Sequence, residues 1–282
     1  MVIDHMRMAL LWYRWSEVSD TLVLDRIRQG NKQALTVLIG RHHASVCSYL
    51  STCLTDPGVV EQATHETFRQ VHEAAERADL LTVNRIQLLS AARSVAIDIW
   101  RADPEGCAVT DGFRHWVTSG GSWPLEAPAA LFDAYRSLPM RWQSALWHMA
   151  VDEDKPSVTA EVLGLPPGRL TITGQRARHA LKDFYLAAYE RSARDRPACL
   201  AHARDRAVFT TVVPGATATG HSSLCLPCAQ ADADLADLDL GLRLQLPAML
   251  LGWWNDTAYQ QMRALALRNS DPRPLSGSIR SA

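Results

Sequence analysis

The sequence predicts an all-α protein, and three observations support this. Hydrophobic residues make up 47% of the 282-residue chain and charged residues 21%, which is typical of a globular protein. Apolar residues recur at helical spacing in most segments, and short stretches rich in Gly or Pro separate them. Ser19 and Asp20 can cap the first of these segments. The length suggests two domains or three small ones.

The first helical part covers residues 19–101. A first helix is expected to follow Ser19. The stretch RQGNKQAL then restarts a second helix, and TDPGVV forms a turn. Two further helices are expected over about residues 59–80 and 84–100. Pro104 and Gly106 end the last of them, because proline and glycine stop helices.

A linker and a second helical part follow. The stretch TSGGSWPLEAPAA is rich in Gly, Ser and Pro and lacks helical periodicity, so residues 102–130 are predicted to be a linker. Residues 131–190 return to helical periodicity. They include a short helix, a turn with Gly164 and a longer helix that starts at two prolines, which is the pattern of a helix-turn-helix.

Leu163, Leu165 and Leu170 are expected to pack the two helices of this motif together. The segment from Lys155 to Arg196 contains eight basic and four acidic residues, although the whole chain has a net charge of -1. This local basic patch favours DNA binding, because Arg and Lys reach phosphates and Arg and Gln reach base edges. The alternative is an ordinary helical hairpin with a solvated charged face. The residues expected to face DNA are Arg169, Thr171, Thr173, Gln175, Arg176, Arg178 and Lys182.

A cluster of potential metal ligands lies further along. His221, Cys225 and Cys228 have the spacing H-x3-C-x2-C, and Cys199 can supply a fourth ligand. A closed Cys3His set is typical of structural zinc and leaves no position open for catalysis. His202 is the substitute ligand if Cys199 does not bind. Two alternatives remain open: buried thiols beside a surface histidine, or a redox-active Cys-x-x-Cys pair.

Other features indicate a protein that is not an enzyme. The sequence contains no GxSxG, Walker, GxGxxG or HExxH motif. The acidic run at residues 152–154 is interpreted as a solvated turn, and His42 and His43 as a helix surface. The remaining cysteines, Cys47, Cys53 and Cys107, are interpreted as core or incidental.

Neither a membrane span nor an export signal is expected. The longest apolar candidate, residues 244–254, is shorter than the roughly 18 residues that a span needs. The apolar stretch near the N-terminus is flanked by charged residues and lacks a cleavage site. A cytoplasmic location with reduced thiols is therefore expected.

The order of these parts resembles an RNA polymerase sigma factor of the sigma-70 family, extracytoplasmic-function (ECF) type. Residues 19–101 resemble sigma region 2, in which Glu66, Thr67 and Phe68 match the helix that docks on the polymerase clamp. The resemblance implies that core polymerase contacts Gln62, Glu66, Phe68 and Gln70, although Phe68 can equally be a core residue. Residues that match the promoter-melting helix are Ala92, Arg93, Ala96, Ile97, Asp98 and Arg101.

By this resemblance Arg93, Asp98 and Arg101 contact the minus-ten promoter element. Trp100 stacks on a base or is buried. Residues 131–190 resemble sigma region 4, a helix-turn-helix bundle whose second helix reads the minus-thirty-five element. The matching residues there include Leu138, Pro139, Arg141, Trp142, Pro156, Ala160, Arg176, Ala177 and Arg178.

The third part, residues 197–252, resembles the small helical zinc-binding fold of anti-sigma factors. Cys199, His221, Cys225 and Cys228 match its ligand pattern. Residues 253–282 are predicted to be a disordered tail. The whole is expected to bind RNA polymerase core and promoter DNA. Its C-terminal zinc module is expected to pack on regions 2 and 4 and to regulate their exposure. Zinc is expected as a structural cofactor, and a separate anti-sigma factor as a further partner. The alternative is a degenerate sigma-like regulator that does not initiate transcription, and a zinc hydrolase is a more distant third.

Overall fold

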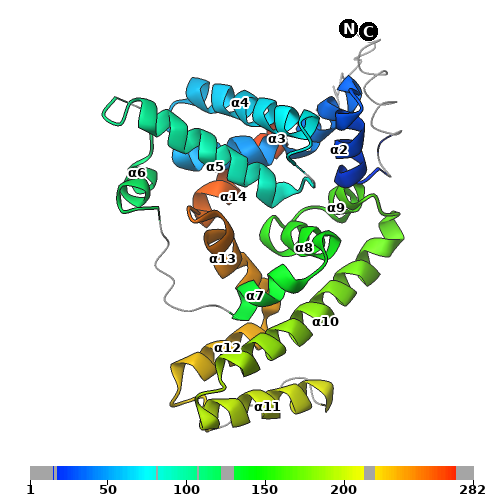
Figure 1. Ribbon diagram of the computed structural model, residues 1–282, viewed down its shortest axis with the longest axis vertical. Coiled ribbons are helices and arrows are strands. Elements are labelled where there is room, and N and C mark those ends of the chain that lie inside the picture. The colour runs from blue at the N-terminus through cyan, green and yellow to red at the C-terminus, as the bar shows by residue number, and fades with distance from the viewer. Residues whose placement is uncertain are drawn as a thin grey trace, which may run out of the picture.

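The computed structural model is built from helices (Figure 1). It describes residues 15, 18–80, 82–106, 108–121, 130–212 and 220–270. Within these ranges no strand forms, although Leu54 and Val109 make an isolated antiparallel β-bridge. The prediction of an all-α fold is therefore confirmed. Cys107 lies outside the described residues.

Four helices form an N-terminal bundle, and a side chain caps the start of each. Ser19, Asn31, Asp56 and Asn84 accept hydrogen bonds from backbone N–H groups in the first turn. These caps satisfy N–H groups that have no partner within the helix, and they fix where each helix begins. The helices are α2 (Asp20–Arg28), α3 (Lys32–Cys53), α4 (Pro57–Glu76) and α5 (Arg85–Ala102).

A further helix, α6 (Asp111–Thr118), lies within the segment 102–130 that the sequence predicts to be a linker. Phe113 and Trp116 are buried on it, and both rings contact Trp253. The linker prediction is wrong here because two aromatic residues three positions apart gain burial against a partner that is distant in sequence. Residues 122–129 of the predicted linker lie outside the described residues.

The second helical group contains the predicted helix-turn-helix. Gly164 ends α9 (Pro156–Leu163) in the left-handed conformation, with φ 59° and ψ 45°. Leu163, Leu165 and Leu170 share one small apolar cluster, as predicted. The longer helix that follows is α10 (Pro167–Ser192). The elements before the motif are α7 (Ala130–Ser137), α8 (Met140–Leu146) and a π-helical turn, η1 (Trp147–Val151).

The C-terminal part adds four helices and corrects the prediction of a disordered tail over residues 253–282. Helix α14 (Asp256–Ser270) packs along α3, and Tyr259 and Arg263 are buried on it. Its apolar residues do not share one face, since Leu265 and Leu267 are exposed, and arginine, buried here, is a residue typical of surface positions. The sequence therefore does not reveal this helix. Residues 271–282 lie outside the described residues. The other helices are α11 (Pro197–Val212), α12 (Leu226–Ala236) and α13 (Leu238–Leu251).

The three predicted parts share one apolar core. A single cluster of buried residues extends from Val23 on α2 to Tyr259 on α14. Helix α13 contacts α5 on one side and α7 and η1 on the other, and in Figure 1 it lies between the N-terminal bundle and the helix-turn-helix group. In the described part of the chain, no helix has both the length and the apolar character to cross a membrane.

Candidate metal centre and nucleic-acid interface

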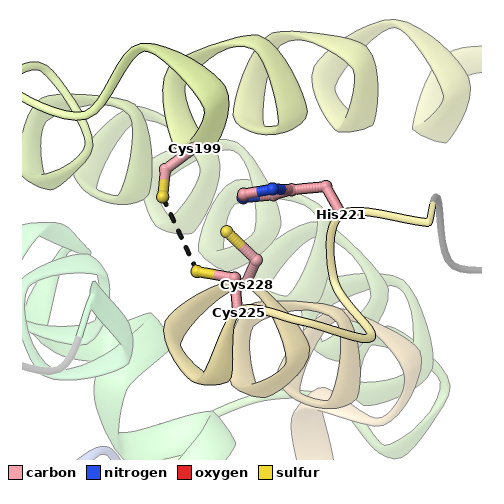
Figure 2. A group of neighbouring side chains, drawn as sticks. All are labelled: Cys199, His221, Cys225 and Cys228. Carbon is pink, nitrogen blue, oxygen red and sulfur yellow. Dashed lines mark hydrogen bonds between the residues drawn. The ribbon is translucent and has the colours of Figure 1, made fainter.

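The four predicted metal ligands come together at the junction of two helices (Figure 2). Cys199 lies in the first turn of α11, while Cys225 and Cys228 lie at the start of α12 and His221 in the turn before it. One ligand atom from each residue lies within 4.8 Å of the others. These four residues could hold a metal ion.

The geometry fits a tetrahedral ion. The sulfur atoms of Cys199 and Cys225 are 3.7 Å apart. A tetrahedral zinc ion with Zn–S bonds of about 2.3 Å places two sulfur ligands about 3.8 Å apart. The Nε2 atom of His221 is buried and has no hydrogen-bond partner among the described residues, which leaves its lone pair or proton unsatisfied. A metal ion would satisfy it.

The surroundings of the cluster come from α10 and α12. The hydroxyl of Tyr189 donates a hydrogen bond to the sulfur of Cys228 at 2.8 Å. Burial raises the pKa of Cys228 to about 12, whereas the backbone N–H of Cys228 lowers the pKa of Cys225. A bound cation would overcome the effect of burial, because a coordinating thiol loses its proton.

His202, the predicted substitute ligand, has a different role. Its ring lies 5.8 Å from the ring of His221, but its Nε2 atom pairs with a carboxylate oxygen of Asp232 at 3.1 Å. His202 therefore supports the wall of the cluster, and Cys199 occupies the fourth position. Four protein ligands fill a tetrahedral shell, which suits a structural metal better than a catalytic one.

The predicted DNA-reading face of α10 is largely accessible. Thr171, Gln175, Arg178 and Lys182 follow one another at helical spacing and share one face of the helix. Arg178 on this face is half-buried because its guanidinium binds Asp239 of α13. The exposed members of the predicted set are Arg169, Thr171, Gln175 and Arg176, and the half-buried ones are Thr173, Arg178 and Lys182.

Two of the three predicted minus-ten residues, Arg93 and Arg101, line a second surface feature. Asp98 and Arg101 are exposed and lie 3.6 Å apart as an ion pair. Arg93 is half-buried and donates a hydrogen bond to the backbone oxygen of Leu251. A surface pocket between α5 and α6 brings these arginines together with two tryptophans. Its lining includes Arg93, Ile97, Trp100, Arg101, Trp116 and Val117.

The predicted polymerase-binding residues on α4 do not all reach the surface. Gln62 is exposed, while Glu66 and Gln70 are half-exposed and hydrogen-bonded to each other at 2.8 Å. A hydrogen bond from Arg69 lowers the pKa of Glu66 to about 2, so this carboxylate is charged. Phe68 is buried, with 4% of its surface exposed. Its prediction as a polymerase contact is wrong, and the alternative, a core residue, is confirmed.

A buried polar cluster is the main feature that sequence reasoning missed. The acidic run at residues 152–154 was expected to be a solvated turn, yet Asp152 is buried and Asp154 pairs with His148 at 2.7 Å. His42, expected on a helix surface, is fully buried and binds Asp20 at 2.6 Å. These groups meet between α3, η1 and α14, and only the assembled core encloses them.

Arginine side chains balance the carboxylates of this cluster. Arg263 of α14 donates to the backbone oxygen of Asp152 at 2.7 Å and to the hydroxyl of Ser45 at 2.9 Å, and it also pairs with Asp154. Arg85 lies 3.4 Å from a carboxylate oxygen of Asp152. His148, Asp152 and Asp154 have the spacing of a metal site. In this structure the guanidinium groups of Arg263 and Arg85 supply the positive charge that a metal ion would bring.

No protein-family model matches the chain, and no curated protein is significantly similar to it.

Proposed function

We propose that the chain is a sigma factor, which binds RNA polymerase core and directs it to promoter DNA. The observation that carries this proposal is the α9–α10 helix-turn-helix, with Gly164 at its turn and Arg169, Gln175 and Arg176 exposed on the second helix. A helix presented in this way fits the major groove, where Arg and Gln distinguish bases. The resemblance to sigma region 4 in the same residues supports it.

The N-terminal bundle would supply the second DNA contact and the polymerase contact. The pocket beside α5 combines two tryptophans with Arg93 and Arg101, which suits single-stranded DNA because bases stack on aromatic rings and arginines bind the backbone. Gln62, Glu66 and Gln70 offer a polar face on α4 for the polymerase clamp. Such a protein changes no covalent bond, and its work is selective binding.

The metal in the Cys3His cluster is proposed to be zinc with a structural role. The sulfur spacing, the unpartnered histidine nitrogen and the complete set of four ligands support it. Zinc binding supplies about 10–16 kcal/mol in small zinc-finger peptides. That exceeds the net stability of many domains, so α11 and α12 would depend on the ion for their packing.

Promoter-directed run-off transcription with purified core polymerase tests the proposal, using DNA selected by the full-length protein together with core. Arg176→Ala is expected to lower the transcript about tenfold, since one base contact contributes about 1–3 kcal/mol. Arg191→Ala is the matched control. It removes the same charge about 22 Å further along α10 and is expected to keep the transcript. Absence of core binding by the wild-type chain would overturn the proposal.

A second candidate function is a sigma-like regulator that binds polymerase without initiating. Two contacts within the protein favour this function. Arg93 binds the backbone oxygen of Leu251 and Arg178 binds Asp239, and both arginines belong to the predicted DNA-contacting set. Binding to core polymerase without any transcript, from wild type and from variants that release these arginines, would support this second function over the first.

A further inference from the structure

Three side chains of metal-binding types lie together on the surface of the N-terminal bundle. His43 belongs to α3, whereas Glu61 and His65 belong to α4. Glu61 and His65 are four positions apart, so they share one face of their helix. Helices α3 and α4 pack against each other, and this packing brings His43 to the same place. In Figure 1 α4 lies at the opposite end of the molecule from α12, which carries part of the Cys3His cluster.

Both imidazole rings approach the same carboxylate oxygen. The Nε2 atom of His65 lies 3.1 Å from Oε1 of Glu61, and the Nε2 atom of His43 lies 3.8 Å from that same Oε1. Nitrogen and oxygen ligands that bind one ion at about 2.0–2.2 Å lie about 3.0–3.6 Å from each other. The two separations are therefore close to those of ligands that share one ion.

The exposure of these side chains lets them adjust to an ion. Their exposed fractions are 40% for His43, 52% for Glu61 and 76% for His65. Binding requires the two rings to turn toward each other, and exposed side chains change rotamer without disturbing a core. The backbone of two packed helices meanwhile holds the three residues at a fixed spacing, which lowers the entropy cost of binding.

No permanent cation balances the charge of Glu61. Within the described residues its ion pairs are those with the two imidazoles, and imidazole is not a permanent cation. The buried carboxylates of Asp152 and Asp154 differ, because arginines pair with them. A divalent cation would therefore compete with an arginine in the buried cluster, whereas at Glu61 it would meet a carboxylate without one.

The ligand types select a transition metal. Imidazole suits zinc, nickel and copper, whereas magnesium and calcium prefer sites made of oxygen atoms. Three protein ligands leave coordination positions for water, unlike the four of the Cys3His cluster. An ion held at an open surface position exchanges with solvent, so it would be lost on gel filtration while the zinc of the Cys3His cluster is kept.

We propose that His43, Glu61 and His65 form a second, exchangeable site for a divalent transition-metal ion, which joins α3 to α4. The proposal does not depend on the proposed function. An ion that binds both helices in the folded chain stabilises that state by mass action.

Isothermal titration of the tag-free, full-length chain with nickel chloride tests this. Nickel is the probe because the tetrahedral, thiolate-rich Cys3His set favours zinc and should keep it. The wild type is expected to bind about one nickel ion. His43→Gln and His65→Gln are each expected to weaken binding about tenfold or more, since each removes one of three ligands. The control is His72→Gln, whose imidazole lies 3.7 Å from Glu76 on the same helix, and it should bind as the wild type does.

Urea denaturation with and without nickel gives a second measurement. Nickel is expected to raise the unfolding midpoint of the wild type and of His72→Gln but not that of His43→Gln, because only a site that spans both helices needs His43. An unchanged nickel affinity in His43→Gln would overturn the inference, as would equal weakening in His72→Gln or no nickel binding by the wild type.

Discussion

At the scale of single residues, the candidate metal site depends on four ligand atoms that lie within 4.8 Å of one another. Cys225 and Cys228 belong to one turn of chain, and His221 lies just before them. Cys199 comes from another helix and lies 3.7 Å from Cys225. The hydroxyl of Tyr189 then ties Cys228 to α10, the helix that carries the predicted DNA-reading face. A change at this cluster would therefore alter a contact of α10.

Removal of one ligand should abolish metal binding. The wild-type chain is expected to contain about one zinc ion, because four ligands complete a tetrahedral shell, and Cys225→Ser is expected to lose it. Elemental analysis by mass spectrometry after gel filtration measures the ratio. Cys47→Ser changes a half-buried thiol outside the cluster and should retain the metal. Equal zinc content in the two serine variants would contradict the assignment of the ligands.

At the scale of elements, the turn between α9 and α10 decides how the second helix is presented. Gly164 adopts φ 59°, a left-handed conformation that costs a residue with a Cβ atom about 1–2 kcal/mol. The following residues place Leu165 and Leu170 against Ala160 and Leu163. The glycine and the leucines together fix the angle at which α10 leaves the motif.

Gly164→Ala is expected to destabilise the protein by about 1 kcal/mol, because alanine is strained at this positive φ. Gly168→Ala is the matched control in the first turn of α10, where a Cβ atom meets nothing within 4 Å. The control should stabilise by a few tenths of a kcal/mol or up to about 1, since alanine favours the helix. Urea denaturation measures both. Destabilisation of similar size in the two variants would argue against the turn.

At the scale of the whole molecule, a buried charged cluster joins the N-terminal bundle to the helix-turn-helix group and to α14. Burial lowers the pKa of His42 to about 4, below its ordinary value of 6.5, so the ring is neutral near neutral pH. Burial alone would raise the pKa of Asp20, but His42 and Arg41 lower it further than burial raises it. The pKa of Asp154 is also lowered, by His148 and by two arginines.

These shifts predict a loss of stability in mild acid. Between pH 6.5 and about 4 the unfolded chain binds a proton at His42 that the folded chain does not, so stability falls as the pH decreases through this window. His42→Gln, which keeps a hydrogen-bond donor toward Asp20, should flatten this dependence. The control is His43→Gln at a half-exposed neighbour. Unfolding midpoints in urea across the window are the measurement, and an unchanged slope in His42→Gln would refute the assignment.

Local sequence signals predicted the elements and part of the site. Helical periodicity, capping residues such as Ser19 and Asn84, and the glycine turn act within one or two turns of chain, so they can be read without knowing the fold. The same holds for the spacing of Cys225 and Cys228. The sequence by itself therefore determined the helical class, the helix-turn-helix and most of the candidate metal ligands.

Only the tertiary structure decided which of these residues remain available. The contact of Arg178 with Asp239 spans 61 positions, and that of Arg93 with Leu251 spans 158. Helix α14 and the burial of His42 likewise depend on the complete core. Such contacts arise when distant apolar faces pack and enclose polar groups, which must then find partners within reach. No local pattern carries that information, because the partner is chosen by the packing of the whole chain.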